Sequence, residues 1–253
     1  MKFNDNSFST IVLVGGMGTR FSKKSDPPKH LTKLNKNLII INIINFIRKS
    51  GFNHFIFPLG SKKKFFVKFF KSKKNQKKYK FELNNNLNQE IVRSDKTYVT
   101  FFDAGENTKK LNRIYKSIKI SNSNHFLVVY GDDLANVNLG KLKEKYFIFK
   151  GKKILVTVFK KNSQYGHLQI KKSGRVIKFI EKPPHPLPIN IGFYMISREV
   201  FQKYFKQNME LEKEFLPSIA KKNLLESFEH KGYFYSINDK KELLTAKKFL
   251  KKL

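Results

Sequence analysis

Glycines and one arginine follow an apolar run near the start of the chain, in a pattern suited to phosphate binding. The run Ile11–Val14 is rich in β-branched residues and predicts a buried parallel strand. Directly after it comes GGMGTR, which contains Gly15, Gly16, Gly18, Thr19 and Arg20. Backbone N–H groups exposed by a glycine-rich loop can hold phosphate oxygens, and a guanidinium adds a charged planar donor. The spacing matches neither the P-loop nor the dinucleotide fingerprint, so a plain tight turn is the alternative.

A carboxylate follows another apolar run further along the chain. The run His125–Tyr130 predicts a second buried strand, and Gly131 and Asp132 come directly after it. An aspartate at a strand end, behind a glycine, is well placed to hold Mg²⁺ beside phosphate groups. Asp132 or the neighbouring Asp133 can instead cap a helix that begins near Leu134, and the two residues can also divide these roles.

Polar residues in other places are suited to a phosphorylated sugar. Lys29 follows two prolines that hold it on an extended segment, and its ammonium can neutralise a phosphate; a solvated surface lysine is the simpler explanation for it alone. Glu181 can accept hydrogen bonds from hydroxyl groups and Lys182 can bind a phosphate, with a strand-end ion pair as the alternative. Asn190 and Gly192 lie on the next expected strand, where a glycine indicates close approach of a ligand or of backbone.

The first half of the chain alternates apolar strands with helices. Strands are expected at residues 11–14, 55–59, 97–102 and 125–130, and helices at 38–49, 62–71 and 108–119. This alternation predicts a Rossmann-like, doubly wound α/β sheet, in which ligands lie at the carboxyl ends of the strands. The glycine loop, Asp103–Gly105 and Gly131–Asp133 should meet at that edge. We expect the first two to end neighbouring strands and to flank a nucleotide base.

The second half is richer in short strands and turns. Strands are expected at residues 154–159, 167–170, 176–181, 189–196, 224–230 and 233–237, and helices at 197–205, 212–221 and 239–253. The polar stretch 72–95 is expected to be a surface excursion with one strand at 79–83. Lys62 is expected to be a solvent-exposed lysine of the helix at 62–71. No linker or repeat interrupts the pattern, which predicts a single domain over residues 1–253.

Composition sets further limits. The chain has 253 residues, 40% of them apolar, which is enough for one α/β domain with a sizeable core. It has no cysteine, which excludes disulfides and fits a cytoplasmic location, and it has no apolar stretch long enough to span a membrane. The net charge of +33 comes from lysines scattered over many elements, so compositional drift is favoured over a dedicated nucleic-acid surface.

Taken together, these motifs resemble those of the sugar-1-phosphate nucleotidyltransferases. The matching order is strand–GGMGTR, Pro28-Lys29, strand–Gly131-Asp132, Tyr165-Gly166, Glu181-Lys182-Pro183 and Asn190-Ile191-Gly192. The similarity extends over essentially the whole chain, and the order is more specific than any single motif. GDDLANV at 131–137 and the pattern Glu212-x-Glu214-x-Leu216 are most similar to the glucose-1-phosphate cytidylyltransferase branch.

The resemblance implies a role for each motif. The nucleotide would be surrounded by Gly15, Gly16, Gly18, Thr19, Arg20, Gly105 and Gly131. Arg20 and Lys29 would neutralise charge at the reaction centre, and Asp132 would hold Mg²⁺. The sugar phosphate would be bound by Gly166, Glu181, Lys182, Asn190 and Gly192. The implied fold is a mixed sheet of the nucleotide-diphospho-sugar transferase type, with residues 1–140 binding the nucleotide and 141–253 forming a smaller, β-rich sugar-binding half and the last helix.

Two positions depart from the family pattern. His30 stands where the family has proline. The family's second metal-binding aspartate falls at Ser236 or Asn238, depending on the alignment, and Asp239 can substitute for it. Asn238 is the first choice for this second metal position, because its carbonyl oxygen can still coordinate a cation.

These features predict an enzyme that converts an NTP and a sugar 1-phosphate into an NDP-sugar and pyrophosphate. CTP with glucose 1-phosphate is the first expectation, and another pair, such as that of a mannose-1-phosphate guanylyltransferase, is the second. A weakened relative that only binds nucleotide sugars is the alternative class, since the second aspartate is missing. The expected partners are the two substrates, with Mg²⁺ as cofactor, no membrane and no specific nucleic acid; a homo-oligomer is left open.

Overall fold

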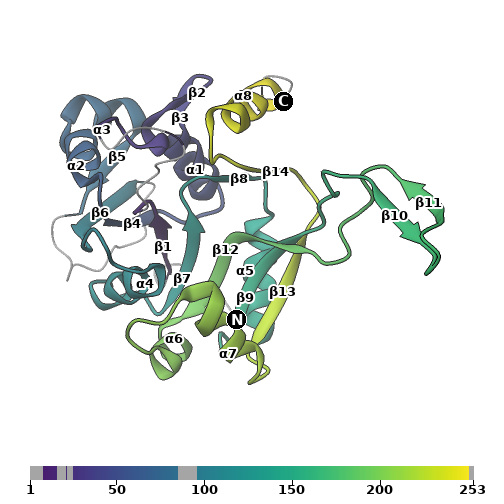
Figure 1. Cartoon of the computed structure of the whole chain (residues 1–253). Helices are drawn as coiled ribbons and strands as arrows, with labels where there is room; N and C mark the ends of the chain where they lie inside the picture. Colours follow the sequence, from purple (N-terminus) through teal and green to yellow (C-terminus); the bar gives the residue numbers. More distant parts are fainter. Residues whose placement is uncertain (1–7, 16–20, 22–24, 85–95, 251–253) are drawn as a thin grey trace.

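An eight-stranded sheet runs through the centre of the structure, with helices on both faces (Figure 1). The computed structural model describes residues 8–15, 21, 25–84 and 96–250. The strand order is β13-β9-β12-β7-β1-β4-β6-β5. In chain order the strands are β1 (Phe8–Leu13), β4 (His54–Leu59), β5 (Phe81–Leu83), β6 (Thr97–Asp103), β7 (His125–Tyr130), β9 (Ile154–Phe159), β12 (Ile189–Ser197) and β13 (Leu225–His230). Only β12 is antiparallel to its neighbours in this sheet, which confirms the predicted doubly wound mixed α/β fold.

Successive side chains of the central strands point to opposite faces of the sheet, and both faces are covered by a layer of helices. In β1, Val12 packs into one buried cluster, whereas Ile11 and Leu13 pack into the other, so both faces of the strand are covered. The first cluster is completed by α1 (Ile39–Arg48), α2 (Lys63–Lys71), α5 (Leu139–Ile148) and α8 (Lys240–Leu250). The second is completed by α4 (Lys110–Lys119), α6 (Arg198–Tyr204), the π-helical turn η3 (Leu211–Phe215) and α7 (Leu216–Ala220).

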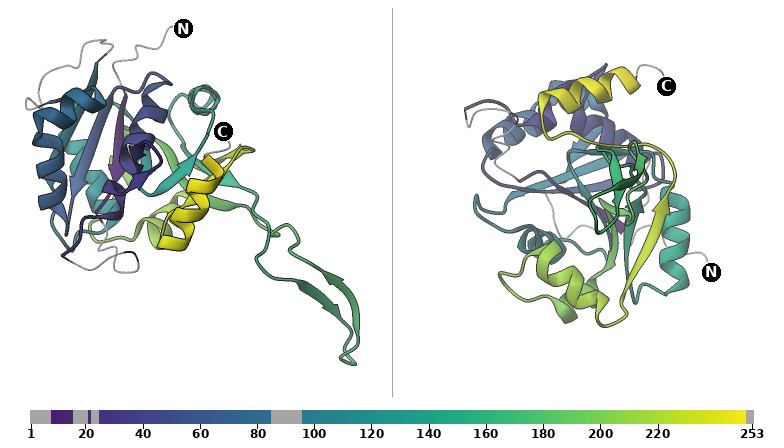
Figure 2. Two further views of the ribbon diagram at one scale, coloured as in Figure 1. Left: turned by 90° about the horizontal axis from the view of Figure 1, so that it is seen from above. Right: turned by 45° about the vertical axis from the view of Figure 1, so that its right-hand side comes forward.

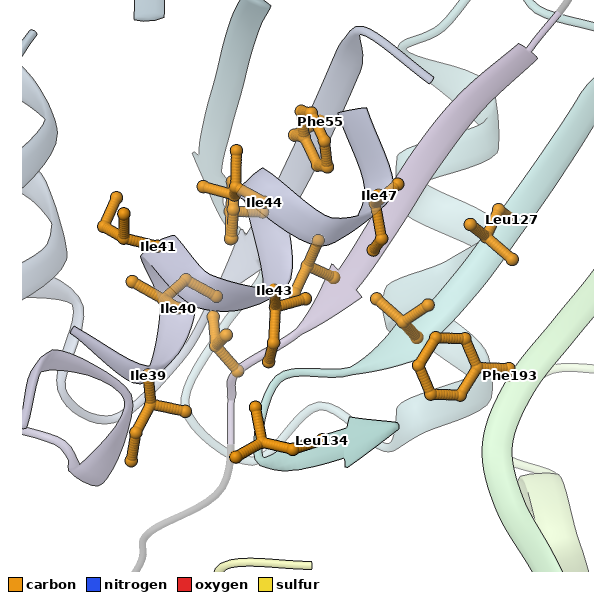
Figure 3. Close-up of a cluster of buried hydrophobic side chains, with 14 of the residues drawn as sticks. Ile39, Ile40, Ile41, Ile43, Ile44, Ile47, Phe55, Leu127, Leu134 and Phe193 are labelled. Atoms are coloured by element: carbon orange, nitrogen blue, oxygen red, sulfur yellow. The ribbon is translucent and has the colours of Figure 1, made fainter. Parts of the chain in front are cut away.

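The helix α1 shows why this region folds as it does. Six of its ten residues are buried isoleucines, which pack against strand residues such as Phe55 and Leu127 (Figure 3). β-branched residues have weak helix propensity, so burial against the sheet rather than intrinsic preference holds this segment helical. Asn42 is half-buried, and its amide donates to the carbonyl oxygens of Leu38 (3.1 Å) and Leu34 (3.3 Å).

Several short elements complete the fold. A 3₁₀ turn, η2 (Lys29–Leu31), leads into the small hairpin of β2 (Lys33–Leu34) and β3 (Asn37–Leu38). Beside the main sheet, β8 (Asp133–Ala135) pairs antiparallel with β14 (Phe234–Ser236). The ribbon of β10 (His167–Ile170) and β11 (Val176–Ile180) projects well away from the rest of the chain (Figure 2). Its residues are exposed, including large apolar ones such as Ile170 and Phe179.

Most of the expected elements are present, but four expectations are wrong. Residues 73–79 form the helix α3 (Lys73–Tyr79) rather than a loop, because Ser72 accepts a hydrogen bond from Asn75 N–H and Lys80 ends the helix in a left-handed conformation. Asp133 begins a strand instead of capping a helix, because β14 pairs with it. The ends of β1 and β6 are not neighbours, because β4 lies between these strands. Lys62 is buried, as described below.

A buried polar cluster lies at the amino edge of the central strands, opposite the carboxyl edge where a ligand is expected. Ser9 Oγ lies 2.8 Å from His54 Nδ1 and 2.7 Å from Ser123 Oγ, and His54 Nε2 lies 2.9 Å from Thr100 Oγ1. Burial lowers the pKa of His54 from 6.5 to about 4, so the ring is neutral at pH 7. These bonds satisfy polar groups inside the fold and lie far from the carboxyl edge.

Acidification should therefore destabilise the protein between pH 6.5 and pH 4. In this window the unfolded chain protonates His54 and the folded protein does not, so the unfolded state binds more protons and gains stability as the pH falls. The loss per group reaches ~1.4 kcal/mol per pH unit. Urea unfolding at pH 7, 5.5 and 4.5 should show a shallower acid loss for His54→Gln than for the wild type. Equal pH slopes in the two proteins would contradict this role.

Candidate active site

A cleft of about 880 Å³ opens at the carboxyl edge of the central strands. Its wall contains Gly15 after β1, Lys62 after β4, Arg113 of α4 and Asp132 after β7. Segments distant in sequence also reach it, including Asn238 before α8. This is the position and the size at which open α/β sheets bind small molecules.

Lys29 and Asp132 meet in this cleft. Lys29 Nζ lies 2.5 Å from Asp132 Oδ2, and the two side chains are only 11% and 23% exposed. Lys29 Nζ also donates to the Ile237 carbonyl oxygen (2.8 Å), while the Ile237 N–H donates to the Asp132 carbonyl oxygen (2.9 Å). The η2 turn, the end of β7 and the segment after β14 are thereby tied together. An anionic substrate arriving here meets one cation and one carboxylate held in fixed positions.

Asp133 lies directly behind this pair and is almost fully buried. Burial and the neighbouring Asp132 carboxylate raise the pKa of Asp133 to about 7, against the opposing hydrogen bond from Ser236. Its carboxylate occupies space beside Gly192, where an added Cβ would lie 2.8 Å from Oδ2. Gly192 has φ +74°, so a side chain would be disfavoured there by conformation as well as by space. The glycine therefore serves close packing against Asp133 rather than forming part of the cleft wall.

The segment before α8 provides the other side of the possible metal position. Asn238 lines the cleft; its N–H donates to Glu242 Oε2 (2.6 Å) and its amide nitrogen donates to Ser236 Oγ (3.1 Å). Asp239 Oδ1 accepts from the Glu242 N–H (2.8 Å), which makes Asp239 the cap of α8, and it does not line the cleft. Of the candidates 236, 238 and 239, the first two thus face the cleft and the third has a structural task.

The donor set suits a hard divalent cation that also binds phosphates. Asp132, Asp133 and Asn238 present oxygen atoms, and the mutual repulsion of the two carboxylates would be relieved by a cation. Within the described residues, no group of three or more His, Asp or Glu side chains could hold a metal ion by itself. A cation here would complete its shell with phosphate oxygens and water.

A hydrogen-bonded chain forms the wall between α4 and β12. Tyr130 Oη donates to Glu212 Oε1 (2.5 Å) and lies 3.0 Å from Tyr194 Oη, and Asn190 Nδ2 donates to Tyr194 Oη (2.5 Å). Lys110 pairs with the same Glu212 oxygen. Burial and these neighbours raise the pKa of Tyr130 far above its usual value, so its hydroxyl remains protonated. The chain fixes the orientation of Asn190 at the cleft.

The charge of the cleft is mixed, with cations in excess. Its basic residues are Lys29, Lys62, Lys109, Lys110, Arg113 and Lys161, and its acidic residues are Asp132, Asp133, Glu210 and Glu242. Burial lowers the pKa of His30 to about 4, so this histidine is neutral at pH 7. A cleft of this composition favours a polyanionic ligand over a cationic or an apolar one.

Sequence reasoning missed five of the six basic residues that line the cleft, and two of the five, Lys62 and Arg113, are buried. Lys62 is 6% exposed and lines the cleft, so its expected place on a solvent face is wrong. Its position just after β4 was an available signal, because β4 lies between β1 and β6 and its carboxyl end must share their edge. Arg113 lies in the middle of a helix, where nothing in the local sequence distinguishes it from a surface arginine.

The structure brings together some of the predicted site residues and not others. Gly15, Lys29, Asp132, Asn190 and Asn238 line the cleft. Gly131 packs against Val14 and His30 just behind it, and the Gly105 carbonyl oxygen accepts a hydrogen bond from Arg113. Glu181 and Lys182 are exposed at the base of the β10–β11 ribbon, with Gly166 close to Glu181, and none of these lines the cleft. Gly16, Gly18, Thr19 and Arg20 lie outside the described residues.

Comparisons with known proteins find related sequences over most of the chain. Residues 9–252 match the nucleotidyl transferase family. The chain is 32% identical over 246 residues to the probable glucose-1-phosphate cytidylyltransferase of Bacillus subtilis, with 94% of each chain covered. It is 27% identical to the glucose-1-phosphate cytidylyltransferase of Salmonella typhimurium, with 88% of each covered.

Solved structures show the same fold. HddC from Yersinia pseudotuberculosis, which has also been solved with GMP-PN, superposes with a TM-score of 0.65 at 19% identity, over 96% of this chain and 99% of that one. A Bacillus anthracis protein superposes with a TM-score of 0.70 at 16% identity, over 97% and 96% of the two chains. In the described part of the present chain, no helix is long and apolar enough to cross a membrane.

Proposed function

The chain belongs to the nucleotidyl transferase family and is a sugar-1-phosphate nucleotidyltransferase, and on that premise we propose that it transfers a cytidylyl group from CTP to glucose 1-phosphate. The products are CDP-glucose and pyrophosphate. The choice of CTP and glucose is supported by the two cytidylyltransferases above, each similar over at least 88% of its length. Mannose-1-phosphate guanylyltransferases are more distant, at 24% identity over 62% of their length, and make GTP with mannose 1-phosphate the second candidate.

One observation carries the assignment of the reaction to this cleft. Lys29 and Asp132, from segments about a hundred residues apart, form a largely buried ion pair at the carboxyl edge of the sheet. A lysine can neutralise a phosphate and an aspartate can hold a metal ion, and nucleotidyl transfer needs both next to each other. Arg20 is proposed to add a second cation from the glycine loop.

The chemistry requires positioning rather than proton transfer. A phosphate oxygen of the sugar 1-phosphate is anionic at neutral pH and attacks the α-phosphorus of the NTP in line. As this P–O bond forms, the bond to the bridging β-phosphate oxygen breaks, and pyrophosphate leaves with that oxygen and its electron pair. Lys29 stabilises the negative charge on the transferred phosphoryl oxygens and holds the two phosphates close together. No general base is needed.

We propose that the cofactor is Mg²⁺, held by Asp132 and by the carbonyl oxygen of Asn238. When bound, a divalent cation neutralises the triphosphate and stabilises the leaving pyrophosphate. Mg²⁺ usually takes only one or two carboxylates from the protein and completes its shell with phosphates and water. A neutral second ligand is therefore compatible with binding, although the weaker charge should increase the Mg²⁺ concentration required.

The sugar side is proposed to form from the second half of the chain. Asn190 faces the cleft and can donate to, or accept from, sugar hydroxyl groups. From the ribbon base, Glu181 is proposed to accept hydrogen bonds from sugar hydroxyl groups and Lys182 to bind the phosphate group. A Cβ at Gly166 would lie 2.4 Å from the Phe179 ring and 3.1 Å from Glu181 Oε2, so close packing in the ribbon accounts for the glycine. Residues 1–140 would then bind the nucleotide and 141–253 the sugar phosphate.

A substrate screen tests the proposal. Pyrophosphate release should be measured with CTP, UTP, GTP, ATP and dTTP, each against glucose 1-phosphate and mannose 1-phosphate. We expect CTP with glucose 1-phosphate to give the highest kcat/KM. A higher value for another pair would transfer the assignment to that pair. Nucleotide-sugar binding without turnover in any pair would instead support the weakened relative suggested by the neutral residue at position 238.

A further inference from the structure

The guanidinium of Arg113 donates to backbone carbonyl oxygens at the carboxyl ends of three strands, β1, β4 and β6, or directly after them. Its Nε donates to the Thr108 carbonyl oxygen (2.9 Å), and its Nη1 donates to the carbonyl oxygens of Pro58 (3.1 Å) and Leu59 (2.9 Å). Its Nη2 lies within hydrogen-bond distance of the carbonyl oxygens of Gly15 (3.3 Å), Gly105 (2.8 Å) and Glu106 (3.1 Å). A guanidinium has five N–H donors, so these six acceptors occupy all of them.

These acceptors lie at the carboxyl ends of three strands or directly after them. Gly15 follows β1, Leu59 ends β4, and Gly105 follows β6. The sheet pairs β4 with both β1 and β6, and the Ala104 N–H donates to the Leu59 carbonyl oxygen (2.9 Å), but β1 and β6 are themselves separated by β4. Arg113 joins the Gly15 and Gly105 segments, which follow strands that are not neighbours in the sheet, through one rigid planar group.

The surrounding glycines show that the group fits without spare room. An added Cβ at Gly60 would lie 2.6 Å from Arg113 Nη2 and 2.8 Å from the Gly15 carbonyl oxygen. Real Cβ atoms do not approach this closely, so even a methyl group at position 60 must displace the guanidinium or the Gly15 loop. Gly60 has no positive φ to demand a glycine, so the close packing against Arg113 accounts for it.

The charge of Arg113 is directed at the cleft that it lines. Carbonyl oxygens carry no formal charge and do not neutralise it. Burial lowers the pKa of Arg113, opposed by the nearby Asp103, but an arginine remains protonated in proteins. Arg113 therefore contributes positive potential to the cleft, and its hydrogen bonds also hold the backbone at Gly15 and Gly105 in place.

We propose that Arg113 is a positioning residue for the nucleoside triphosphate, acting through the Gly15 and Gly105 segments and not by direct contact. The inference rests on the proposed function, because it assigns the NTP to this side of the cleft. With its donors occupied, Arg113 fixes the backbone at Gly15 and Gly105 and has no donor left for the ligand. It should therefore govern affinity for the NTP and leave affinity for the sugar phosphate unchanged.

Arg198 is a matched control elsewhere in the fold. It also donates from a partly buried guanidinium to backbone carbonyl oxygens, those of Ile118 (2.9 Å) and Ser123 (2.7 Å) among them. These acceptors precede β7 at the amino edge of the sheet, opposite the cleft. Replacing Arg198 removes the same kind of hydrogen bond and lowers the stability of the fold, but it leaves the residues of the cleft unchanged.

The test compares the substrate affinities of the Arg113→Lys and Arg198→Lys variants. All measurements are made well below the melting temperatures of both variants. For Arg113→Lys we expect the NTP Kd by calorimetry and the NTP KM to rise about tenfold or more, as for the loss of charged hydrogen bonds. The sugar 1-phosphate KM should stay within about threefold of the wild type. Arg198→Lys should lower the melting temperature and leave both KM values unchanged. An unchanged NTP Kd in Arg113→Lys, or an equal rise in both variants, would overturn the inference.

A second variant covers the case in which Arg113→Lys does not fold. Gly60→Ala keeps the arginine and displaces it, so the NTP Kd should rise in the same direction and the sugar-phosphate KM should not. An unchanged NTP Kd in a folded Gly60→Ala protein would contradict the positioning role of Arg113. Failure of the wild type to bind any NTP would refute the proposed function itself, which separates the two ideas.

Discussion

Asp132→Asn should reduce turnover by ~10³-fold or more, because it removes the carboxylate proposed to hold the metal ion beside the reacting phosphates. The amide keeps the size of the side chain and an acceptor oxygen, but it loses the negative charge that pairs with Lys29. The fold should survive, since the carbonyl oxygen of Asp132 still accepts from the Ile237 N–H. Steady-state pyrophosphate release and a melting curve on the same preparation measure both effects.

Asp239→Asn is the matched control for this prediction. It makes the same chemical change at a residue that caps α8 and does not line the cleft. We expect turnover near that of the wild type and a small loss of stability, ~1 kcal/mol or less, from the weakened cap. Full metal-dependent activity in Asp132→Asn, or complete loss in Asp239→Asn, would show that the metal position has been misplaced.

Lys29→Met should reduce turnover by ~10²-fold or more, the cost of losing one preorganised charged donor at a reaction centre. Methionine retains much of the apolar stem, so packing against the η2 turn should be preserved. The loss should appear mainly in kcat, because the cation is proposed to stabilise charge that develops on the transferred group.

Lys64→Met tests whether this effect is specific. Lys64 is an exposed lysine of α2 and does not line the cleft, so its replacement should change turnover by less than about twofold. Lys62, although nearby, is unsuitable as a control because it is buried in the cleft wall. Equal activities of the Lys29 and Lys64 variants would remove Lys29 from the mechanism.

The main features of the fold follow from local patterns in the sequence. Apolar runs such as 125–130 predict their strands well, because a parallel strand covered on both faces must be apolar throughout. The helix α3 could not be recognised in this way, since it buries no residue and depends on its caps at Ser72 and Lys80. No element was expected over α5, although Leu139, Leu142 and Tyr146 have helical spacing, because Gly140 and several lysines interrupt the pattern.

The candidate site was predictable where residues directly follow strands. Gly15 and Asp132 could be placed at one edge by that argument alone. The order of the strands could not, because it depends on long-range packing, and the expected contact of the β1 and β6 ends was wrong for this reason. Arg113 bonds to backbone at the ends of β1, β4 and β6, and nothing in the sequence around it predicts this position. The exposed position of Glu181 depends on where the β10–β11 ribbon points, which also has no local signal.

The most direct test of the account is to identify the product formed in the presence of both substrates and Mg²⁺. Wild-type protein incubated with CTP and glucose 1-phosphate should yield CDP-glucose and pyrophosphate in equal amounts, as measured by mass spectrometry and an enzyme-coupled pyrophosphate assay. Omission of either substrate should abolish both products, and Asp132→Asn should lower their rate of formation by ~10³-fold or more. Absence of any NDP-sugar from the wild type with every NTP and sugar 1-phosphate, despite a folded protein, would contradict the proposed reaction.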